Sequence, residues 1–199
     1  IEHGAAVVIH SLTKYIGGHG TAIAGSIVDS GNFDWTADPK RQPLFNEPDA
    51  SYSGAVWGKV VPELTGANIP FAVRARVCLL RDLGSACSPD NAFSIIQGLE
   101  TVALRMKQHC ENAQKVVDYL KKHKEVTKVI FSTEHDKLIA DIAKKYLKGG
   151  NGPMVGIELK GGFEAGKRFI ESLKMCDHVA KIGDARRLAI HPASTTHSK

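Results

Sequence analysis

Apolar and polar residues follow one another in blocks that predict short strands near the N-terminus, a long central helix and a mixed segment after it. Two apolar runs, residues 5–9 (AAVVI) and 22–28 (AIAGSIV), predict buried strands. Residues 31–58 are rich in Gly, Pro, Asn, Asp and Ser and predict a long surface excursion, which is usually functional or part of an interface. Its aromatic residues are scattered: Phe33, Trp35, Phe45, Tyr52 and Trp57. Residues 71–84 predict a helix that Gly84 ends.

The strongest helical pattern covers residues 88–124. Ser88 is a suitable N-cap, and Pro89 suits the first helical position. Apolar residues then recur at helical spacing for about eight turns, and Gly98 is a candidate bend. We expect this helix to link two lobes.

Strand and helix patterns alternate in the last part of the chain, which predicts a compact α/β or α+β lobe. The predicted strands cover residues 126–131, 154–160, 178–183 and 187–191, and the predicted helices cover residues 136–148 and 163–176. The chain is therefore expected to comprise one domain segment over residues 1–87, the linking helix over 88–124 and a smaller domain over 125–199.

Composition limits the class of protein. Of the 199 residues, 43% are hydrophobic and 24% are charged, which is ordinary for a soluble globular protein. No apolar run approaches the roughly 18 to 20 residues of a membrane helix. Four widely spaced cysteines without a CxxC pair favour reduced thiols and a cytoplasmic protein. The net charge of +5 is modest and the aromatics do not interleave with the cations, so nucleic-acid binding by a basic module is the weakest option.

One lysine stands out, in the segment HSLTKYIGGHG that covers residues 10–20. Lys14 follows a predicted strand, so its position is fixed, and its small polar neighbours would admit a phosphorylated cofactor. Ser11 and Thr13 would share one face of an extended segment and, with backbone N–H groups, could hold a phosphate. A surface lysine in a glycine-rich turn explains the same pattern, and these observations leave both interpretations open.

Other chemistry has weaker support. The GGHG run has neither the spacing of a Walker loop nor that of a dinucleotide-binding motif. His10 and His19 lie nine residues apart with no carboxylate between them, so no metal site is predicted. No cysteine has a setting that would lower its pKa, and no G-x-S-x-G motif is present.

The segment HSLTKYIGGHG resembles the cofactor-lysine motif of the pyridoxal-phosphate enzymes of cysteine and methionine metabolism, the trans-sulfuration family. Three further segments agree with this family in order and spacing: RVCLLRDLG, SPDNAFSIIQGLETVALRMKQHCENA and GDARRLAIHPASTTH. Within the family the chain is most similar to the O-acetylhomoserine sulfhydrylases, through GGHGTAIAGSIVDSGNFDW and PDASYSG. Cystathionine γ-synthase and the cystathionine or methionine γ-lyases are the alternatives.

The resemblance implies an α/β fold of the aspartate-aminotransferase-like type (fold type I), with a parallel-rich cofactor domain. It implies that Lys14 forms the Schiff base with pyridoxal phosphate and that Ser11 and Thr13 contact the cofactor phosphate. It also implies an amino-acid substrate, a γ-replacement that turns O-acetylhomoserine and sulfide into homocysteine and acetate, and a homotetramer built as a dimer of dimers.

The chain departs from the family pattern in three respects. It opens on Ile1, so we expect it to be a fragment without the N-terminal part, which in relatives carries the groups around the cofactor ring. Lys181 stands where relatives carry Ser or Asn against the substrate carboxylate, and a lysine would bind a carboxylate as a point charge. Asp90 replaces a usual phenylalanine at a helix start, where the dipole favours it. A catalytically incomplete fragment is therefore the alternative from another class.

Overall fold

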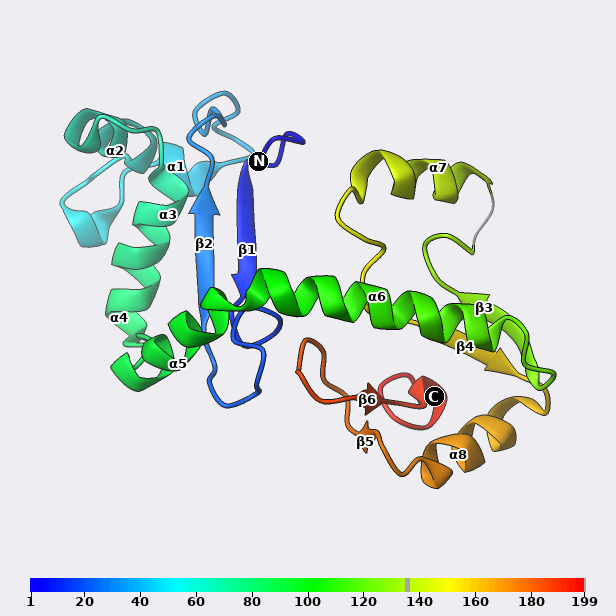
Figure 1. The fold of residues 1–199 in the computed structure, drawn as a ribbon. Coiled ribbons are helices and arrows are strands. Elements are labelled where there is room, and N and C mark those ends of the chain that lie inside the picture. Colours follow the sequence, from blue (N-terminus) through cyan, green and yellow to red (C-terminus); the bar gives the residue numbers. More distant parts are fainter. Residues whose placement is uncertain (135–136, 199) are drawn as a thin grey trace. The chain divides into compact units, whose positions relative to one another are not determined.

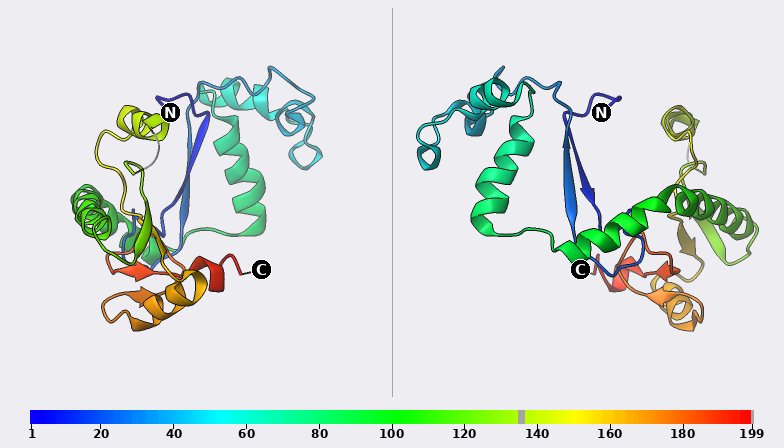
Figure 2. Two further views of the ribbon diagram at one scale, coloured as in Figure 1. Left: turned by 90° about the vertical axis from the view of Figure 1, so that its right-hand side faces the viewer. Right: turned by 60° about the vertical axis from the view of Figure 1, so that its left-hand side comes forward.

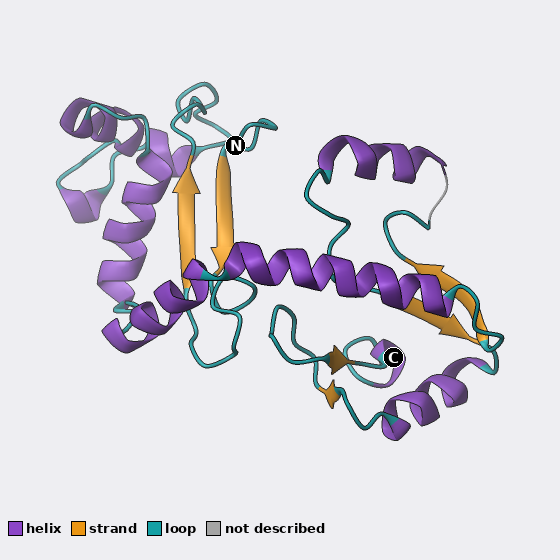
Figure 3. Ribbon diagram, viewed as in Figure 1, coloured by secondary structure: helices purple, strands orange, loops and turns teal. Residues whose placement is uncertain are grey.

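The computed structural model of the chain describes residues 1–134 and 137–198. The chain forms two compact units, of which the first comprises Ile1–Leu12 and Ile23–Ala92 and the second comprises Thr13–Ala22 and Phe93–Lys199. Figure 1 follows the chain through its elements, and Figure 3 separates helices, strands and loops. Residues 13–22, called the lysine loop below, cluster with the second unit although they lie between two strands of the first. The sequence did not predict this grouping.

The first unit contains an antiparallel ribbon of β1 (Val7–Ser11) and β2 (Gly25–Asp29), which Figure 2 shows side by side in both views. The register pairs Val7 with Asp29 and Ser11 with Gly25. Both predicted strands are confirmed, but the prediction that they are buried is wrong. Ile9 is 68% exposed, and among the described residues β1 pairs with β2 in a two-stranded sheet.

The helices of the first unit pack around an aromatic core. They are α1 (Pro43–Asn46), the 3₁₀ turn η1 (Ala50–Tyr52), α2 (Trp57–Thr65), α3 (Pro70–Arg74), the π-helical η2 (Ala75–Leu80) and α4 (Arg81–Leu83). Phe45, Trp57 and Val61 are buried, and Trp35 stacks on Phe71 at 5.3 Å between ring centroids. The excursion over residues 31–58 is thus not only a surface loop, since its aromatic side chains build this core.

Two predicted helix ends in this region are confirmed. Gly84 ends α4 in the left-handed conformation at φ 72°, and its N–H donates to Leu80 O at 2.9 Å. Ser88 caps the next helix, α5 (Pro89–Glu100), because its Oγ accepts a hydrogen bond from Asn91 N–H at 3.2 Å. Asp90 lies in the first turn of α5, where its charge faces the positive end of the helix dipole.

The long helix predicted over residues 88–124 is divided in the structure. It consists of α5 and α6 (Val102–Leu120), which are separated at Thr101. Gly98 lies one turn before this break, so the predicted bend falls close to the observed one. The lysine loop approaches the helix closely at Gly98, just before this break.

The second unit continues with β3 (Val126–Ile130), α7 (Lys137–Tyr146), β4 (Gly156–Leu159), α8 (Gly162–Ser172), β5 (Asp177–His178), β6 (Leu188–Ala189) and the 3₁₀ turn η3 (Pro192–Ser194). The predicted order of strands and helices is confirmed, although the predicted start of α7 at Asp136 lies outside the described residues. β3 and β4 pair antiparallel, and β5 and β6 pair parallel. Ala113 and Val117 of α6 pack on Val129 and Phe131 beside the β3–β4 ribbon.

The four cysteines (Cys78, Cys87, Cys110 and Cys176) are free thiols. None of the helices over residues 1–134 and 137–198 is both long and apolar enough to cross a lipid bilayer.

A buried charge organises the loop between β5 and β6. Asp184 is 5% exposed and accepts hydrogen bonds from Lys181 Nζ and from Arg186 N–H, each at 2.9 Å. Burial alone would raise the pKa of Asp184, but the hydrogen bonds from Arg186 and Lys181 outweigh it and hold the pKa well below its ordinary value. The carboxylate therefore stays ionised in the folded chain.

We predict that Asp184→Asn in the full-length protein lowers the free energy of unfolding by about 3 kcal/mol, because it leaves the Lys181 ammonium without its buried partner. The folded pKa is depressed, so the stability from ionised Asp184 is present above the unfolded pKa of about 3.9 and is lost as pH falls below it. Urea unfolding between pH 3 and 8 measures this.

The difference in the free energy of unfolding between wild type and Asp184→Asn should stay constant from about pH 5 upward and become smaller below about pH 4. Asp141→Asn, at an exposed acid of α7, is the control and should change stability by less than about 0.5 kcal/mol. A difference that grows as the solution becomes more acidic would contradict the assignment.

Candidate functional site

Lys14 lies in a turn that begins where β1 ends. The strand stops at Ser11, residues 12–17 turn, and Gly18 N–H donates to Lys14 O at 2.7 Å. The Lys14 side chain is half-buried. Within the part of the chain that the structure describes, no hydrogen bond or ion pair engages the Lys14 amine. The turn thus fixes the backbone of a lysine whose amine is available for a ligand.

The two hydroxyl residues before Lys14 lie in different local structures. Ser11 is exposed at the end of β1, opposite Gly25 of β2. Thr13 is half-buried and lies in the turn. The expectation that both lie on one face of an extended segment is therefore wrong, because the strand ends between them. Their predicted contact with a phosphate remains a prediction.

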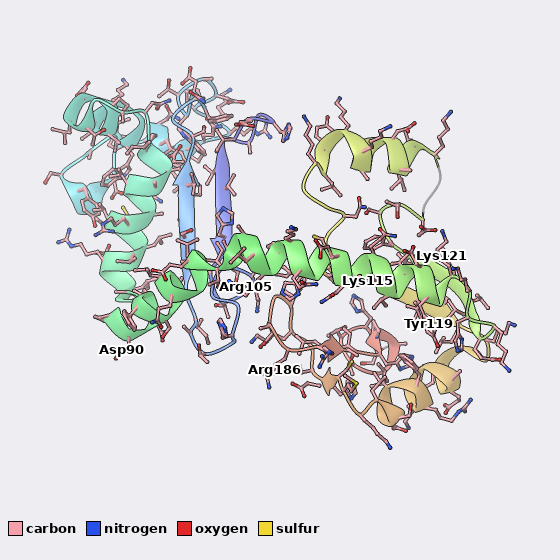
Figure 4. All side chains as sticks on the ribbon, in the orientation of Figure 1. Asp90, Arg105, Lys115, Tyr119, Lys121 and Arg186 are labelled. Carbon is pink, nitrogen blue, oxygen red and sulfur yellow. The ribbon has the colours of Figure 1, made fainter. Side chains whose placement is uncertain are left out.

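Arg105, in the first turn of α6, binds the backbone directly after Lys14. Its Nη1 donates to Tyr15 O at 2.7 Å, and its Nη2 donates to Ile16 O at 3.1 Å. The same Nη2 donates to Gly98 O at 2.6 Å, near the end of α5. Figure 4 labels Arg105 on α6 near its start. One guanidinium therefore joins the lysine loop to the ends of two helices.

Three glycines permit this close packing within the second unit. A Cβ atom on Gly98 would collide with the carbonyl oxygens of Gly17 and Ile16. A Cβ atom on Gly18, which has φ 74°, would collide with the Arg105 guanidinium. A Cβ atom on Gly183 would lie 2.7 Å from the carbonyl carbon of Lys14. The backbone around Lys14 is thus held at van der Waals contact from two sides.

The loop between β5 and β6, which contains Asp184, contacts the lysine loop on a second side. Ala185 N–H donates to Gly18 O at 2.8 Å, and the Lys181 ammonium lies against the backbone of Gly20. Lys181 has a side chain only 19% exposed and is paired with Asp184. Its predicted contact with a substrate carboxylate is not tested by this geometry, which shows that one of its donors is already used.

Tyr15, the residue after Lys14, packs against α6. Its ring meets that of His109 edge to face, with 6.2 Å between centroids. Burial raises the pKa of the Tyr15 phenol above its ordinary value, and the Cys110 thiol adds to the rise. Tyr15 is therefore a neutral packing group that further anchors the loop.

Sequence reasoning identified Lys14, Ser11, Thr13 and Lys181 but missed Arg105, Asp184 and Gly183. One signal for Arg105 was available, because it lies next to the apolar stripe of α6 between Val102 and Met106. A cation beside an apolar stripe needs polar partners, but only the fold reveals that these are carbonyl oxygens from a segment about 90 residues away.

The whole chain is similar to known proteins of one family. A family model described as Cys/Met metabolism PLP-dependent enzyme matches residues 1–199. The chain is 48% identical to an O-acetyl-L-homoserine sulfhydrylase of Leptospira meyeri, over 100% of this chain and 46% of that protein. It is 44% identical to a homocysteine synthase of Schizosaccharomyces pombe, over 99% of this chain and 45% of that protein. The chain thus spans about half the length of these curated relatives.

Solved structures are similar in fold as well. A protein of Campylobacter jejuni assigned as an O-acetylhomoserine (thiol)-lyase superposes with a TM-score of 0.86 at 35% identity, over 100% of this chain and 46% of that chain. That structure contains a pyridoxyl-lysine monophosphate. A cystathionine γ-synthase of Xanthomonas oryzae pv. oryzae gives a TM-score of 0.68 at 28% identity, over 99% of this chain and 41% of that chain.

The fold is accordingly that of part of a fold type I pyridoxal-phosphate enzyme, with helices and strands mixed as predicted. A match over residues 1–199 to the family model, together with relatives at 40–48% identity, identifies the chain as a member of the pyridoxal-phosphate-dependent enzymes of cysteine and methionine metabolism.

Proposed function

We propose that the full-length protein converts O-acetylhomoserine and sulfide into homocysteine and acetate. The observation that carries this proposal is the sequence identity of 48% to an O-acetyl-L-homoserine sulfhydrylase across the whole chain, together with a half-buried lysine whose amine is not engaged within the described residues. Because the chain covers 46% of that relative, the activity is proposed for the full-length protein.

The residues present fit the lysine and phosphate ends of pyridoxal phosphate. Lys14 offers a primary amine on a fixed backbone, which is the group that condenses with an aldehyde. Ser11 and Thr13 offer hydroxyl donors of the kind that bind phosphate oxygens. When bound, the cofactor supplies an electron sink for the carbanion at the substrate α-carbon.

Lys14 has two roles in this proposal. Its amine would hold the cofactor covalently. The same amine, when neutral and not bonded to the cofactor, would remove and return a proton at the substrate α-carbon as a general base and acid. Its half-buried setting limits the access of water to that proton.

Lys181 is proposed to bind the substrate carboxylate. Its ammonium has three N–H donors, and one is directed to Asp184, so two remain for a ligand. Asp184 would then hold the ammonium in place by the 2.9 Å hydrogen bond. A point charge held in this way binds a carboxylate without the bidentate geometry of an arginine.

We further propose a homotetramer of two dimers and a cytoplasmic location. The family resemblance supports the first, and the four free, widely spaced cysteines support the second.

Two alternatives are favoured by specific observations. The fold similarity to cystathionine γ-synthase, and to a cystathionine γ-lyase of Lactobacillus plantarum at 27% identity, supports a synthase or lyase reaction on a related substrate. A catalytically incomplete chain is the second alternative, and the 199 residues span under half of the length of these relatives. Assays of the full-length protein with sulfide and with cysteine separate the reactions. The alternative of a catalytically incomplete chain is tested by adding pyridoxal phosphate to the isolated 199-residue chain, which should then show no absorbance band of the bound cofactor.

We predict that borohydride reduction of the full-length protein with pyridoxal phosphate labels Lys14, and that Lys14→Ala loses the label and lowers kcat by about 10³-fold or more. Peptide mapping by mass spectrometry identifies the labelled residue. Lys59→Ala, which removes an exposed lysine of the first unit, is the matched control. A label at any other lysine would refute the assignment.

We predict that Ser11→Ala and Thr13→Ala each raise the dissociation constant of pyridoxal phosphate about tenfold, because each removes one hydrogen bond to an ionised phosphate. Fluorescence titration of the apo-protein measures the constant. Thr21→Ala, at an exposed hydroxyl of the lysine loop, should leave it unchanged. Equal effects of all three substitutions on the dissociation constant would contradict the assignment of Ser11 and Thr13 as phosphate ligands.

We predict that Lys181→Met raises KM for O-acetylhomoserine about tenfold with a smaller change in kcat, because it removes a charge from the ground-state and transition-state complexes alike. Steady-state kinetics at saturating sulfide measures both. An unchanged KM would show that Lys181 serves only as the partner of Asp184.

A further inference from the structure

We propose that Arg105 is a positioning residue for Lys14, an inference that rests on the proposed role of Lys14 as the cofactor lysine. Arg105 does not touch the reacting atoms in this proposal. It acts through the backbone of Tyr15 and Ile16, the two residues that follow Lys14.

The hydrogen bonds of Arg105 use the guanidinium as a fork. Its Nε donates to Thr101 Oγ1 at 3.1 Å, within the same helical turn, and this bond orients the plane of the group. The two Nη atoms then reach Tyr15 O, Ile16 O and Gly98 O. Four donors of one rigid planar group are thus used at once, which a lysine ammonium cannot reproduce.

The partners of Arg105 among the described residues are carbonyl oxygens and one hydroxyl, with no carboxylate. Gly98 lies in the last turn of α5, and its carbonyl accepts hydrogen bonds from Thr101 N–H and Thr101 Oγ1, each at 3.3 Å, in addition to the shorter one from Arg105. Tyr15 and Ile16 lie in the turn over residues 12–17, after β1 has ended. One guanidinium therefore connects the lysine loop to the last turn of α5, at the break between α5 and α6.

The contacts of Arg105 also hold the turn that contains Lys14. Gly18 N–H closes the turn on Lys14 O, and the guanidinium covers the face of Gly18 where a Cβ atom would stand. Release of Tyr15 and Ile16 would therefore loosen the turn that holds the Lys14 carbonyl. The direction of the Lys14 side chain depends on that backbone, so Arg105 controls where the amine lies.

The test uses the full-length protein with Arg105→Met and Arg105→Lys. Lys107→Met is the control, because this residue lies on the same helix with a side chain that is 77% exposed. We expect Arg105→Met to speed hydrogen exchange of the Gly18 amide in the apo-protein about tenfold, since several charge-assisted hydrogen bonds are lost. Arg105→Lys should restore protection only in part, and Lys107→Met should leave it unchanged.

A second measurement separates positioning from general damage. We expect Arg105→Met to slow the covalent attachment of pyridoxal phosphate to Lys14 about tenfold, because the amine is misplaced. The rate of attachment is measured by the change in visible absorbance. The dissociation constant of pyridoxine 5′-phosphate, which has no aldehyde, should stay unchanged. A loss of both attachment and pyridoxine phosphate binding, or faster exchange along all of α6, would overturn the proposal in favour of a purely structural role.

If Arg105→Met does not give folded protein, Thr101→Val replaces it, because this change removes the hydroxyl that orients the guanidinium. Both readouts should then move in the same direction by a smaller factor, and no change in either would overturn the proposal. Failure of the proposed function is distinguishable, since wild type would then show no attachment at Lys14 while the exchange measurement still reports on Arg105.

Discussion

The backbone that follows Lys14 is held by hydrogen bonds to its carbonyl oxygens, and the rest of the candidate site depends on them. Arg105 binds the carbonyls of Tyr15 and Ile16, and Ala185 N–H binds that of Gly18. A loop after a strand is otherwise free to move, which would leave a catalytic amine without a defined direction. Donors from distant parts of the sequence replace the regular hydrogen-bond ladder that ends at Ser11.

Asp184 and Arg105, the charged residues of the two segments that contact the lysine loop, offset the free-energy cost of burying a charge in different ways. Asp184 is buried with a lysine and a backbone N–H, so its charge has a partner of opposite sign. Arg105 instead spreads its charge over carbonyl dipoles, which suits the weakly hydrated guanidinium. Both anchors need glycine at the contact, and Gly98 and Gly183 let the chains approach to distances that a Cβ atom would prevent.

Local features of the fold were predictable from sequence, and features that depend on distant contacts were not. The cap of Ser88 on α5 and the termination at Gly84 follow from short-range rules and are confirmed. The exposure of Ile9 and the approach of Ile16 and Gly17 to Gly98 depend on which segments lie nearby, and periodicity carries no such information. Lys14 was identified through the family resemblance, whereas Arg105 was missed because its partners are far away in the sequence.

The most direct test of the account is a crystal structure of the full-length protein grown with pyridoxal phosphate. The account predicts continuous electron density between Lys14 Nζ and the cofactor, with the Arg105 guanidinium on the carbonyls of Tyr15 and Ile16 and the phosphate against Ser11 and Thr13. Density that joins the cofactor to another lysine, or a cofactor bound away from the lysine loop, would contradict it.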